Sequence, residues 1–355
     1  MLTAPRKSTP PRIVIADDSS FMRRLLAQAL TEGGFEVVGQ AADGDEALEL
    51  FRRLRPDAMT LDLAMPGLDG IGVLRALRAE WGRRSIPVVV VSAFSPDHGA
   101  RAVDALAEGA FDLVAKPAFG EPLEQFVATL RDKVNAAVAI DEEHAAPVAV
   151  PAPVAVQAPP PPAPPEAATS DRVVVIASST GGPRALSVVV PALPRMLGSG
   201  GLIIQHMPAG FTASLAERLN KMSAIRVVEA TDGERLRSDT LLLAPGGSHL
   251  RLRRGGRSKL SDEDAIGGLR PRADLTIMDA ARLYGDRLLL VVLTGMGKDG
   301  LEGARQVRAR GGRIIVEAPS TCTVYGMPRA IAEAGLADEI LPLDQIAAAI
   351  TREVA

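Results

Sequence analysis

Short apolar runs alternate with amphipathic stretches along the first part of the chain. The apolar runs predict five strands, at Arg12–Ala16, Phe35–Gly39, Asp57–Leu61, Pro87–Val91 and Phe111–Ala115. Between them, apolar residues recur at helical spacing and predict helices over Phe21–Thr31, Asp45–Arg55, Gly70–Glu80 and Asp97–Gly109. Apolar strands separated by helices are typical of a parallel sheet with helices on both faces. The pattern therefore predicts a five-stranded, doubly wound α/β unit.

The same alternation restarts farther along the chain. Buried strands are predicted at Val173–Ala177, Gly201–Gln205, Thr240–Ala244, Leu288–Leu293 and Arg313–Val316. The segment His249–Asp262 contains Arg-Gly-Gly-Arg, which favours a turn between two short strands. We therefore predict a second doubly wound α/β domain with a β-hairpin insert.

A proline-rich stretch separates the two patterns. Between Ala145 and Ser170 the chain holds nine of its 27 prolines. Proline lacks an amide donor and fixes φ, so neither a helix nor a central strand can continue through this stretch. It predicts an extended spacer, with a proline-rich recognition site as the alternative. The predicted organisation is a first domain at residues 12–133, a Pro/Ala-rich linker at 134–170 and a second domain at 171–355.

The composition is that of a protein with enough apolar residues to form two hydrophobic cores. The 355 residues are 47% hydrophobic and 23% charged, with a formal net charge of -3. Lys and Arg form no basic stripe, so no nucleic-acid partner is expected. The chain has no run of about 18 uncharged apolar residues, so direct membrane insertion is not expected, and its first residues lack the apolar stretch of a secretory signal. Together with a single cysteine, Cys322, these features predict a cytoplasmic protein.

Acidic and polar residues follow the predicted strands of the first domain. Asp17 and Asp18 end the first strand, Asp62 follows the third, Ser92 the fourth and Lys116 the fifth. The carboxyl ends of parallel strands meet at one edge of the sheet, where ligands bind. Three carboxylates gathered there repel one another unless a hard cation lies among them, and Mg²⁺ prefers such ligands. A lysine and a hydroxyl suit phosphoryl oxygens, and a carboxylate such as Asp62 can form an aspartyl phosphate.

Any one of these residues alone is more often a turn residue or a helix cap. Together, the strings IADDSS, LDLAMPGLDG, VVVVSA and VAKP within residues 12–133 resemble the response-regulator receiver family. The resemblance implies a flavodoxin-like fold and phosphorylation of Asp62. It also implies Mg²⁺ held by Asp17, Asp18 and Asp62, with the phosphate sensed by Ser92 and Lys116.

A glycine-rich loop, Ser178-Ser179-Thr180-Gly181-Gly182-Pro183, follows the first strand of the second domain. Its glycines allow close backbone approach, and proline suits the first position of a helix. Free amides at a helix start can bind an anion or stabilise an oxyanion. Alone, the loop also fits a phosphate or dinucleotide loop or a serine N-cap, and it is not the G-x-S-x-G of an α/β-hydrolase elbow.

Two further residues lie at the ends of other predicted strands in this domain. His206 ends its strand in IIQHMP, and Asp299 lies in LTGMGKDG after the strand Leu288–Leu293. Three strands thus present Ser179, His206 and Asp299 at one sheet edge. These residue types fit a nucleophile, a general base and the carboxylate that orients it. A lone histidine is more often structural, so the prediction depends on the three residues together, with Ser178 interpreted as a bystander.

The strings SSTGGP, QHMPAGFTASLAERLN, DGERL, LTGMGKDG and CTVYGMPR, within residues 172–343, resemble the chemotaxis-specific protein-glutamate methylesterase family. The resemblance implies a Rossmann-like α/β hydrolase domain without a cofactor, in which Ser179 is the nucleophile, His206 the base and Asp299 its partner. Oxyanion donors are expected near Thr180 and Met296. The implied reaction is hydrolysis of glutamate γ-methyl esters, with deamidation of some glutamines, on methyl-accepting chemotaxis receptors. The receiver would inhibit this activity until a chemotaxis histidine kinase phosphorylates it.

Three residues depart from these families. Leu113 stands three residues before the lysine, where many receivers have Phe or Tyr, which predicts altered transmission of the phosphorylation signal. Ile277 replaces a frequent aromatic and predicts altered substrate contacts. Lys298 replaces a frequent Asn and predicts a charge that perturbs Asp299.

Two other functions of the second domain fit part of its sequence pattern. Its glycine-rich loop would suit a non-catalytic nucleotide-binding module, but no G-x-G-x-x-G follows the strand and no ribose-binding acid is evident. A DNA-binding output is the common partner of receivers, but neither a helix-turn-helix pattern nor clustered basic residues are present.

Overall fold

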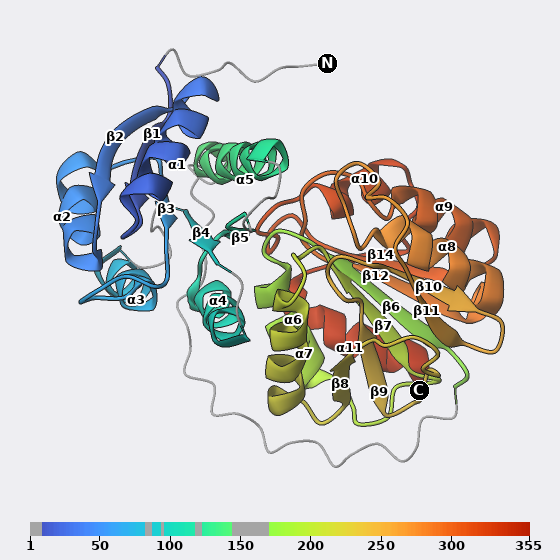
Figure 1. The fold of residues 1–355 in the computed structure, drawn as a ribbon. Coiled ribbons are helices and arrows are strands. Elements are labelled where there is room, and N and C mark those ends of the chain that lie inside the picture. The colour runs from blue at the N-terminus through green and yellow to red at the C-terminus, as the bar shows by residue number, and fades with distance from the viewer. Residues whose placement is uncertain (1–8, 82–86, 94–95, 118–122, 144–169) are drawn as a thin grey trace. The chain divides into compact units, whose positions relative to one another are not determined.

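The computed structural model describes residues 9–81, 87–93, 96–117, 123–143 and 170–355. The chain divides into two compact units, Met1–Pro147 and Val148–Ala355, and each has its own parallel sheet (Figure 1).

The first unit is built on five parallel strands in the order β2-β1-β3-β4-β5. The strands are β1 (Arg12–Ala16), β2 (Glu36–Ala41), β3 (Ala58–Leu61), β4 (Val88–Ser92) and β5 (Asp112–Ala115). Strands β3 and β4 are buried along their whole length, because helices cover both faces of the sheet. Since β1 lies between β2 and β3, the carboxyl ends of β1, β3, β4 and β5 lie side by side.

Five helices cover this sheet. They are α1 (Ser20–Glu32), α2 (Gly44–Leu54), α3 (Gly70–Trp81), α4 (Pro96–Glu108) and α5 (Leu123–Glu143). Helix α2 packs against α3 and α3 against α4 on one face, and α1 packs against α5 on the other. Side-chain caps fix two helix starts, since Ser19 accepts from the amide of Met22 and Asp43 from that of Glu46.

The predicted fold of the first domain is confirmed, with strand and helix ends within two residues of those predicted. Helix α5 continues to Glu143, so it overlaps the first residues of the predicted linker. The rest of that linker, up to residue 169, lies outside the described residues.

The second unit is built on seven parallel strands in the order β14-β13-β12-β6-β7-β9-β8. They are β6 (Val173–Ser178), β7 (Gly201–Gln205), β8 (Arg226–Glu229), β9 (Thr240–Leu243), β12 (Leu288–Val292), β13 (Arg313–Glu317) and β14 (Glu339–Leu341). The central strands β12, β6 and β7 are fully buried. Their apolar residues alternate between the two faces, so both faces of the sheet form core.

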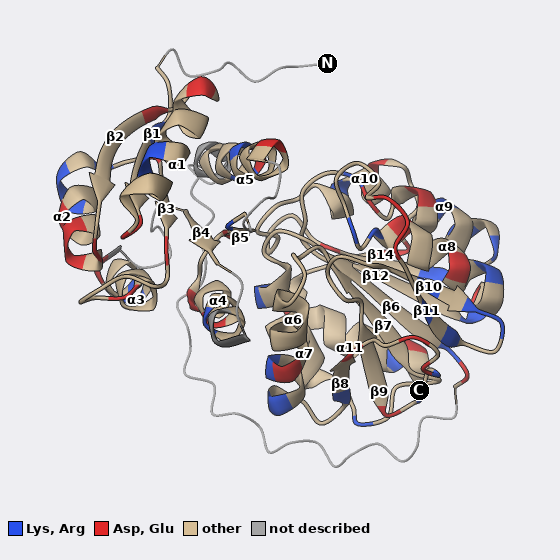
Figure 2. Ribbon diagram, viewed as in Figure 1, with Lys and Arg blue, Asp and Glu red and all other residues tan. Residues whose placement is uncertain are grey.

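Helices cover both faces of the second sheet as well. They are α6 (Gly182–Val189), α7 (Phe211–Met222), α8 (Ala273–Tyr284), α9 (Leu301–Ala309), α10 (Met327–Glu333) and α11 (Leu343–Val354), with 3-10 turns at Val190–Ala192 and Gly285–Arg287. Residues of α8 and of the predicted hairpin pack into one core on the same face of the sheet. The hairpin pairs β10 (His249–Arg253) with β11 (Arg257–Ser261), and basic residues gather along it (Figure 2).

The doubly wound α/β class and the hairpin insert are confirmed, but two strands were not predicted. Strands β8 and β14 are short, only partly buried and lie at the two edges of the sheet. Among the helices in the described ranges, none combines the length and the hydropathy that a membrane span requires.

Candidate active site

Three adjacent strands carry the residues of the candidate catalytic site. Strand β6 lies between β12 and β7, and the loops after their carboxyl ends hold Ser179, His206 and Asp299. The amide of Ser179 donates to the carbonyl oxygen of Thr294 (3.0 Å), and the amide of His206 donates to that of Ser178 (3.0 Å). Backbone hydrogen bonds therefore join the loops after β12 and β7 to the loop that carries Ser179.

The structure distinguishes the two adjacent serines. Ser178 is fully buried, and its hydroxyl donates to Oε1 of Gln205 at 2.7 Å. Ser179 is only half-buried, and its hydroxyl makes no hydrogen bond within the described part of the chain. Of the two serines, only Ser179 is partly exposed and has a hydroxyl free of hydrogen bonds within the described residues.

The imidazole of His206 is fixed by Asp299. Its Nε2 lies 2.8 Å from Oδ2 of Asp299, and both side chains are almost completely buried. An ionised carboxylate only accepts hydrogen bonds, so the proton of a neutral imidazole lies on Nε2. The other nitrogen, Nδ1, is buried and has no hydrogen-bond partner among the described residues. His206 therefore keeps a free lone pair that can accept a proton.

The carboxylate of Asp299 is held by several donors besides the imidazole. Its two oxygens accept hydrogen bonds from backbone amides at 2.7–3.0 Å, those of Ala273, Asp274 and Gly300. The Nε of Arg272 lies 3.1 Å from Oδ1. Burial alone would raise the pKa of Asp299, but the hydrogen bond and charge of His206 and the backbone amides lower it well below its usual range. Asp299 is therefore ionised at neutral pH.

Close packing between loops positions the candidate nucleophile. A Cβ added to Gly295 would lie 2.5 Å from Sδ of Met327 and 2.8 Å from Cβ of Ser179, so only glycine fits there without a shift. Thr294, one residue earlier, donates its hydroxyl to the carbonyl oxygen of Thr180 at 2.9 Å. The loop after β12 thus contacts the Ser179 loop through both backbone and side chain.

A buried glutamate supports this arrangement from β13. Glu317 is fully buried, and its Oε2 accepts a hydrogen bond from the amide of Thr294 at 2.8 Å. Its Oε1 has no hydrogen-bond partner in the described ranges. Burial raises the pKa of Glu317, against the opposing effect of the Thr294 amide. The acid is therefore more easily protonated than an exposed glutamate.

The acidic residues predicted in the first unit also come together. One carboxylate oxygen from each of Asp17, Asp18 and Asp62 lies within 4.8 Å of the others. Nζ of Lys116 lies 2.7 Å from Oδ2 of Asp17 and 2.6 Å from Oδ2 of Asp62. Ser92 ends β4 and is buried, and its carbonyl oxygen accepts the amide of Lys116 at 2.9 Å.

The charges in this cluster fit a hard cation. Burial raises the pKa of Asp17, against the opposing effect of the Lys116 ammonium beside its Oδ2. Burial alone would lower the pKa of Lys116, but its contacts with Asp17 and Asp62 raise it. Three acidic side chains gathered in this way, with Asp17 and Asp62 buried, are a ligand set suited to a divalent metal ion.

Comparison with known proteins assigns the chain to a family. Family models match a response regulator receiver domain at residues 13–128 and a CheB methylesterase at residues 174–350. A protein-glutamate methylesterase/protein-glutamine glutaminase of Symbiobacterium thermophilum is 43% identical over an alignment of 359 positions, which covers 98% of each chain. One from Myxococcus xanthus is 41% identical over 352 residues, which cover 98% of this chain and 99% of the relative. This chain belongs to the protein-glutamate methylesterase/protein-glutamine glutaminase family.

A solved structure supports the same assignment for the second unit. The Thermotoga maritima CheB methylesterase catalytic domain matches with a TM-score of 0.50 and 43% identity, over 52% of this chain and 98% of that domain. Family membership makes this chain an enzyme with a receiver domain. It places the second domain among hydrolases rather than among nucleotide-binding or DNA-binding output domains.

Two of the noted departures have surroundings that differ from those expected. Ile277 was expected to alter substrate contacts, but it is fully buried in the core between α8 and the sheet, so it cannot touch a substrate. Lys298 was expected to perturb Asp299, but its side chain is exposed and forms no ion pair within the described residues. The cation that contacts the acid is Arg272. The third, Leu113, is buried in β5 and occupies the core.

The sequence alone does not reveal three residues that contact the candidate site, namely Gln205, Arg272 and Thr294. Gln205 directly precedes His206, yet nothing in its residue type indicates that its amide reaches back to the Ser179 loop. The predicted oxyanion neighbours differ in exposure, since Thr180 is buried whereas Met296 is 38% exposed. Which amides would bind an oxyanion stays a prediction.

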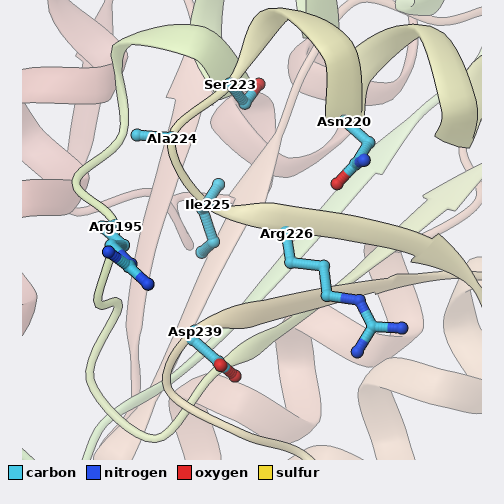
Figure 3. Close-up of a pocket in the computed structure, with 7 residues that line it drawn as sticks. All are labelled: Arg195, Asn220, Ser223, Ala224, Ile225, Arg226 and Asp239. Atoms are coloured by element: carbon cyan, nitrogen blue, oxygen red, sulfur yellow. The ribbon is translucent and has the colours of Figure 1, made fainter.

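A separate hollow does not contribute to this site. It has a volume of about 510 Å³ and is lined by Arg195, Asn220, Ser223, Ala224, Ile225, Arg226 and Asp239 (Figure 3). These residues lie where β8 and β9 begin, at the sheet edge opposite the carboxyl ends of β6 and β7. The candidate catalytic residues lie instead at the other edge, outside this hollow.

Proposed function

We propose that this enzyme hydrolyses the γ-methyl esters of glutamyl side chains on methyl-accepting chemotaxis receptors, with Ser179, His206 and Asp299 as its catalytic residues. The observation that supports this most is the His206–Asp299 pair, whose free Nδ1 remains available to the loop that carries Ser179. A partly exposed serine at a sheet edge can be reached by a side chain presented on another protein.

The proposed reaction has two steps. Oγ of Ser179 forms a bond to the ester carbonyl carbon while its proton passes to Nδ1 of His206 and then to the departing methoxy oxygen, which leaves as methanol. Water then attacks the acyl-enzyme, gives a proton to Nδ1, and the Oγ–acyl bond breaks as Ser179 is reprotonated. The product is glutamate. A glutamine amide would follow the same course with ammonia as the leaving group.

Asp299 would orient the imidazole and stabilise the imidazolium that forms when Ser179 loses its proton. Backbone amides near Thr180 and Met296 would stabilise the oxyanion, with a contribution of about 10²–10³ in rate for each donor. The catalytic chemistry requires no cofactor.

The receiver would control this activity through Asp62. Asp17, Asp18 and Asp62 would hold Mg²⁺, which supplies positive charge for phosphoryl oxygens when bound. In our proposal a chemotaxis histidine kinase phosphorylates Asp62 in the cytoplasm, Ser92 and Lys116 bind the phosphoryl group, and inhibition of the catalytic domain ends. Proximity of Lys116 to both acids supports its role as the phosphate partner.

The test measures methanol released from methylated receptor fragments, with and without a small phosphodonor. Wild-type enzyme should release methanol faster with the phosphodonor, Ser179→Ala should release none in either condition, and Asp62→Asn should show only the unstimulated rate. Ser178→Ala serves as the matched serine variant and should retain more activity than Ser179→Ala. Wild-type rates in Ser179→Ala would refute the serine mechanism, and full stimulation of Asp62→Asn would refute control through that residue.

A further inference from the structure

Arg272 connects the candidate catalytic acid to its surroundings. It lies immediately before α8, and its side chain is only 20% exposed. Its Nε lies 3.1 Å from Oδ1 of Asp299, and its Nη2 lies 2.9 Å from Oδ2 of Asp274. The third nitrogen, Nη1, donates to the carbonyl oxygen of Ile266 at 3.1 Å. All three guanidinium nitrogens therefore have partners in a planar fork.

The backbone of Arg272 is fixed by the second histidine of this domain. Its amide donates to Nδ1 of His249 at 3.1 Å, while Nε2 of His249 lies 3.1 Å from the carbonyl oxygen of Asp264. Since His249 is fully buried and begins β10, the hairpin itself determines where Arg272 lies. His249 is thus a structural residue whose contact places the guanidinium on Asp299.

Arg272 supplies the positive charge for two buried acids. Asp274 and Asp299 are both nearly inaccessible to solvent, and Asp274 also accepts the amide of Gly303 at 2.8 Å. Burial and the charge of Asp299 raise the pKa of Asp274, as expected for two acids close together. Within the described residues, Arg272 is the cation that forms ion pairs with both acids.

The charged groups near His206 lie at increasing distance from its imidazole. Asp299 contacts the imidazole directly from the loop after β12, and Arg272 and Asp274 lie behind it at the start of α8. Lys298 is exposed on the same loop and makes no ion pair in the described ranges. Arg272, in contrast, forms ion pairs with both Asp274 and Asp299.

We propose that Arg272 is a positioning residue for catalysis, which holds Asp299 against His206 and sets the acidic limit of the activity. The proposal rests on the proposed Ser179–His206–Asp299 mechanism. A guanidinium on the far oxygen of Asp299 opposes, by Coulomb repulsion, the positive charge that the imidazole of His206 takes on. Arg272 thereby extends the activity towards acidic pH, and the same contact prevents rotation of the Asp299 carboxylate.

The test compares kcat/KM as a function of pH for three enzymes, with the phosphodonor present throughout. In Arg272→Gln the cation is lost, so kcat should fall by roughly tenfold and the acidic limb should move to higher pH by about half a unit to one unit. In Arg272→Lys the charge remains but the fork is lost, so kcat should fall while the acidic limb stays close to that of wild type. Arg226→Gln is the matched control, an exposed arginine at the opposite sheet edge, and should match wild type.

A merely structural role would lower the amount of active enzyme without moving the profile. An acidic limb unchanged in Arg272→Gln therefore overturns the proposal, as does one that moves equally in Arg272→Lys. If circular dichroism shows that Arg272→Gln does not fold, Asp274→Asn replaces it. Loss of that negative charge should move the acidic limb to lower pH, and an unmoved limb overturns the proposal.

Failure of the proposed mechanism has a different signature. If Ser179→Ala keeps wild-type activity, the catalytic assignment itself is wrong. If Ser179→Ala is inactive but Arg272→Gln has the wild-type pH profile, only the role of Arg272 is wrong.

Discussion

The hydroxyl of Ser178 donates to Oε1 of Gln205 at 2.7 Å, and this contact determines how the amide of Gln205 is used. Its Nε2 then donates to the carbonyl oxygens of Ser179 (2.9 Å) and His206 (3.0 Å). One buried side chain thus joins the backbone of the candidate nucleophile to that of the candidate base. The relative position of these two residues depends on this amide.

We predict that Gln205→Leu lowers kcat by roughly 10²-fold, because small displacements of reacting groups are costly. It should also lower the free energy of unfolding by about 1–3 kcal/mol, since buried polar groups lose their partners. Methanol release and urea denaturation measure the two effects. Gln306→Leu, at a partly exposed position of α9, is the control and should behave as wild type in both. A wild-type kcat in Gln205→Leu would show that the amide does not position the site.

We predict that Asp299→Asn lowers kcat by on the order of 10³–10⁴ with little change in KM. Asparagine keeps the shape of the side chain, but it lacks the negative charge and can present an NH₂ group to Nε2 of His206. The imidazole then loses both its preferred tautomer and the stabilisation of its charged form. Asp286→Asn is the exposed counterpart and should retain full activity. A modest loss in Asp299→Asn, comparable to that of Asp286→Asn, would remove Asp299 from the mechanism.

The sequence was most informative where burial is complete. Strands β6, β7 and β12 are continuous apolar runs, because helices cover both sides of the sheet, and all three were predicted. Edge strands β8 and β14 are short and mix exposed with buried positions, so they leave no clear apolar pattern. Their place depends on the neighbouring strands rather than on their own residues.

The residues of the candidate site also differ in how far the sequence predicts them. Ser179, His206 and Asp299 each follow a strand, and parallel topology alone predicts that such residues meet. Arg272 follows no strand, and its ion pair with Asp299 depends on the hairpin contact to His249. A contact of this kind arises from the folded loops and leaves no periodic signal in the sequence.

Glu317 leads to a prediction about pH and stability. Its pKa in the folded protein is raised above the ordinary value of 4.5, mainly by burial. The folded state therefore favours the protonated form, and the stability gained is present below pH 4.5 and lost as the pH rises through the raised pKa. Glu317→Gln keeps the acceptor for the amide of Thr294 but does not ionise. The melting temperature of Glu317→Gln minus that of wild type should therefore increase between pH 4.5 and pH 8. Parallel thermal scans of the two proteins measure this difference.

The control for this prediction is Glu302→Gln on the exposed surface of α9, whose difference from wild type should change little over the same range. A melting-temperature difference between wild type and Glu317→Gln that is constant with pH would contradict a raised pKa. A melting-temperature difference that decreases as the pH rises would indicate that Glu317 is ionised in the folded protein and stabilised by a nearby positive charge.

The acidic cluster of the first unit leads to the last prediction. Asp17, Asp18 and Asp62 can share a cation, and Lys116 alone cannot neutralise three carboxylates. We expect incorporation of phosphate into Asp62 from a small phosphodonor to require Mg²⁺ and to stop when EDTA removes it. Asp17→Asn should slow the incorporation by at least about tenfold at limiting Mg²⁺, because a ligand of the metal is lost. Asp45→Asn, an exposed acid in the first turn of α2, is the matched control. Equal labelling of wild type with and without EDTA would mean that Lys116 neutralises the phosphoryl group without a metal.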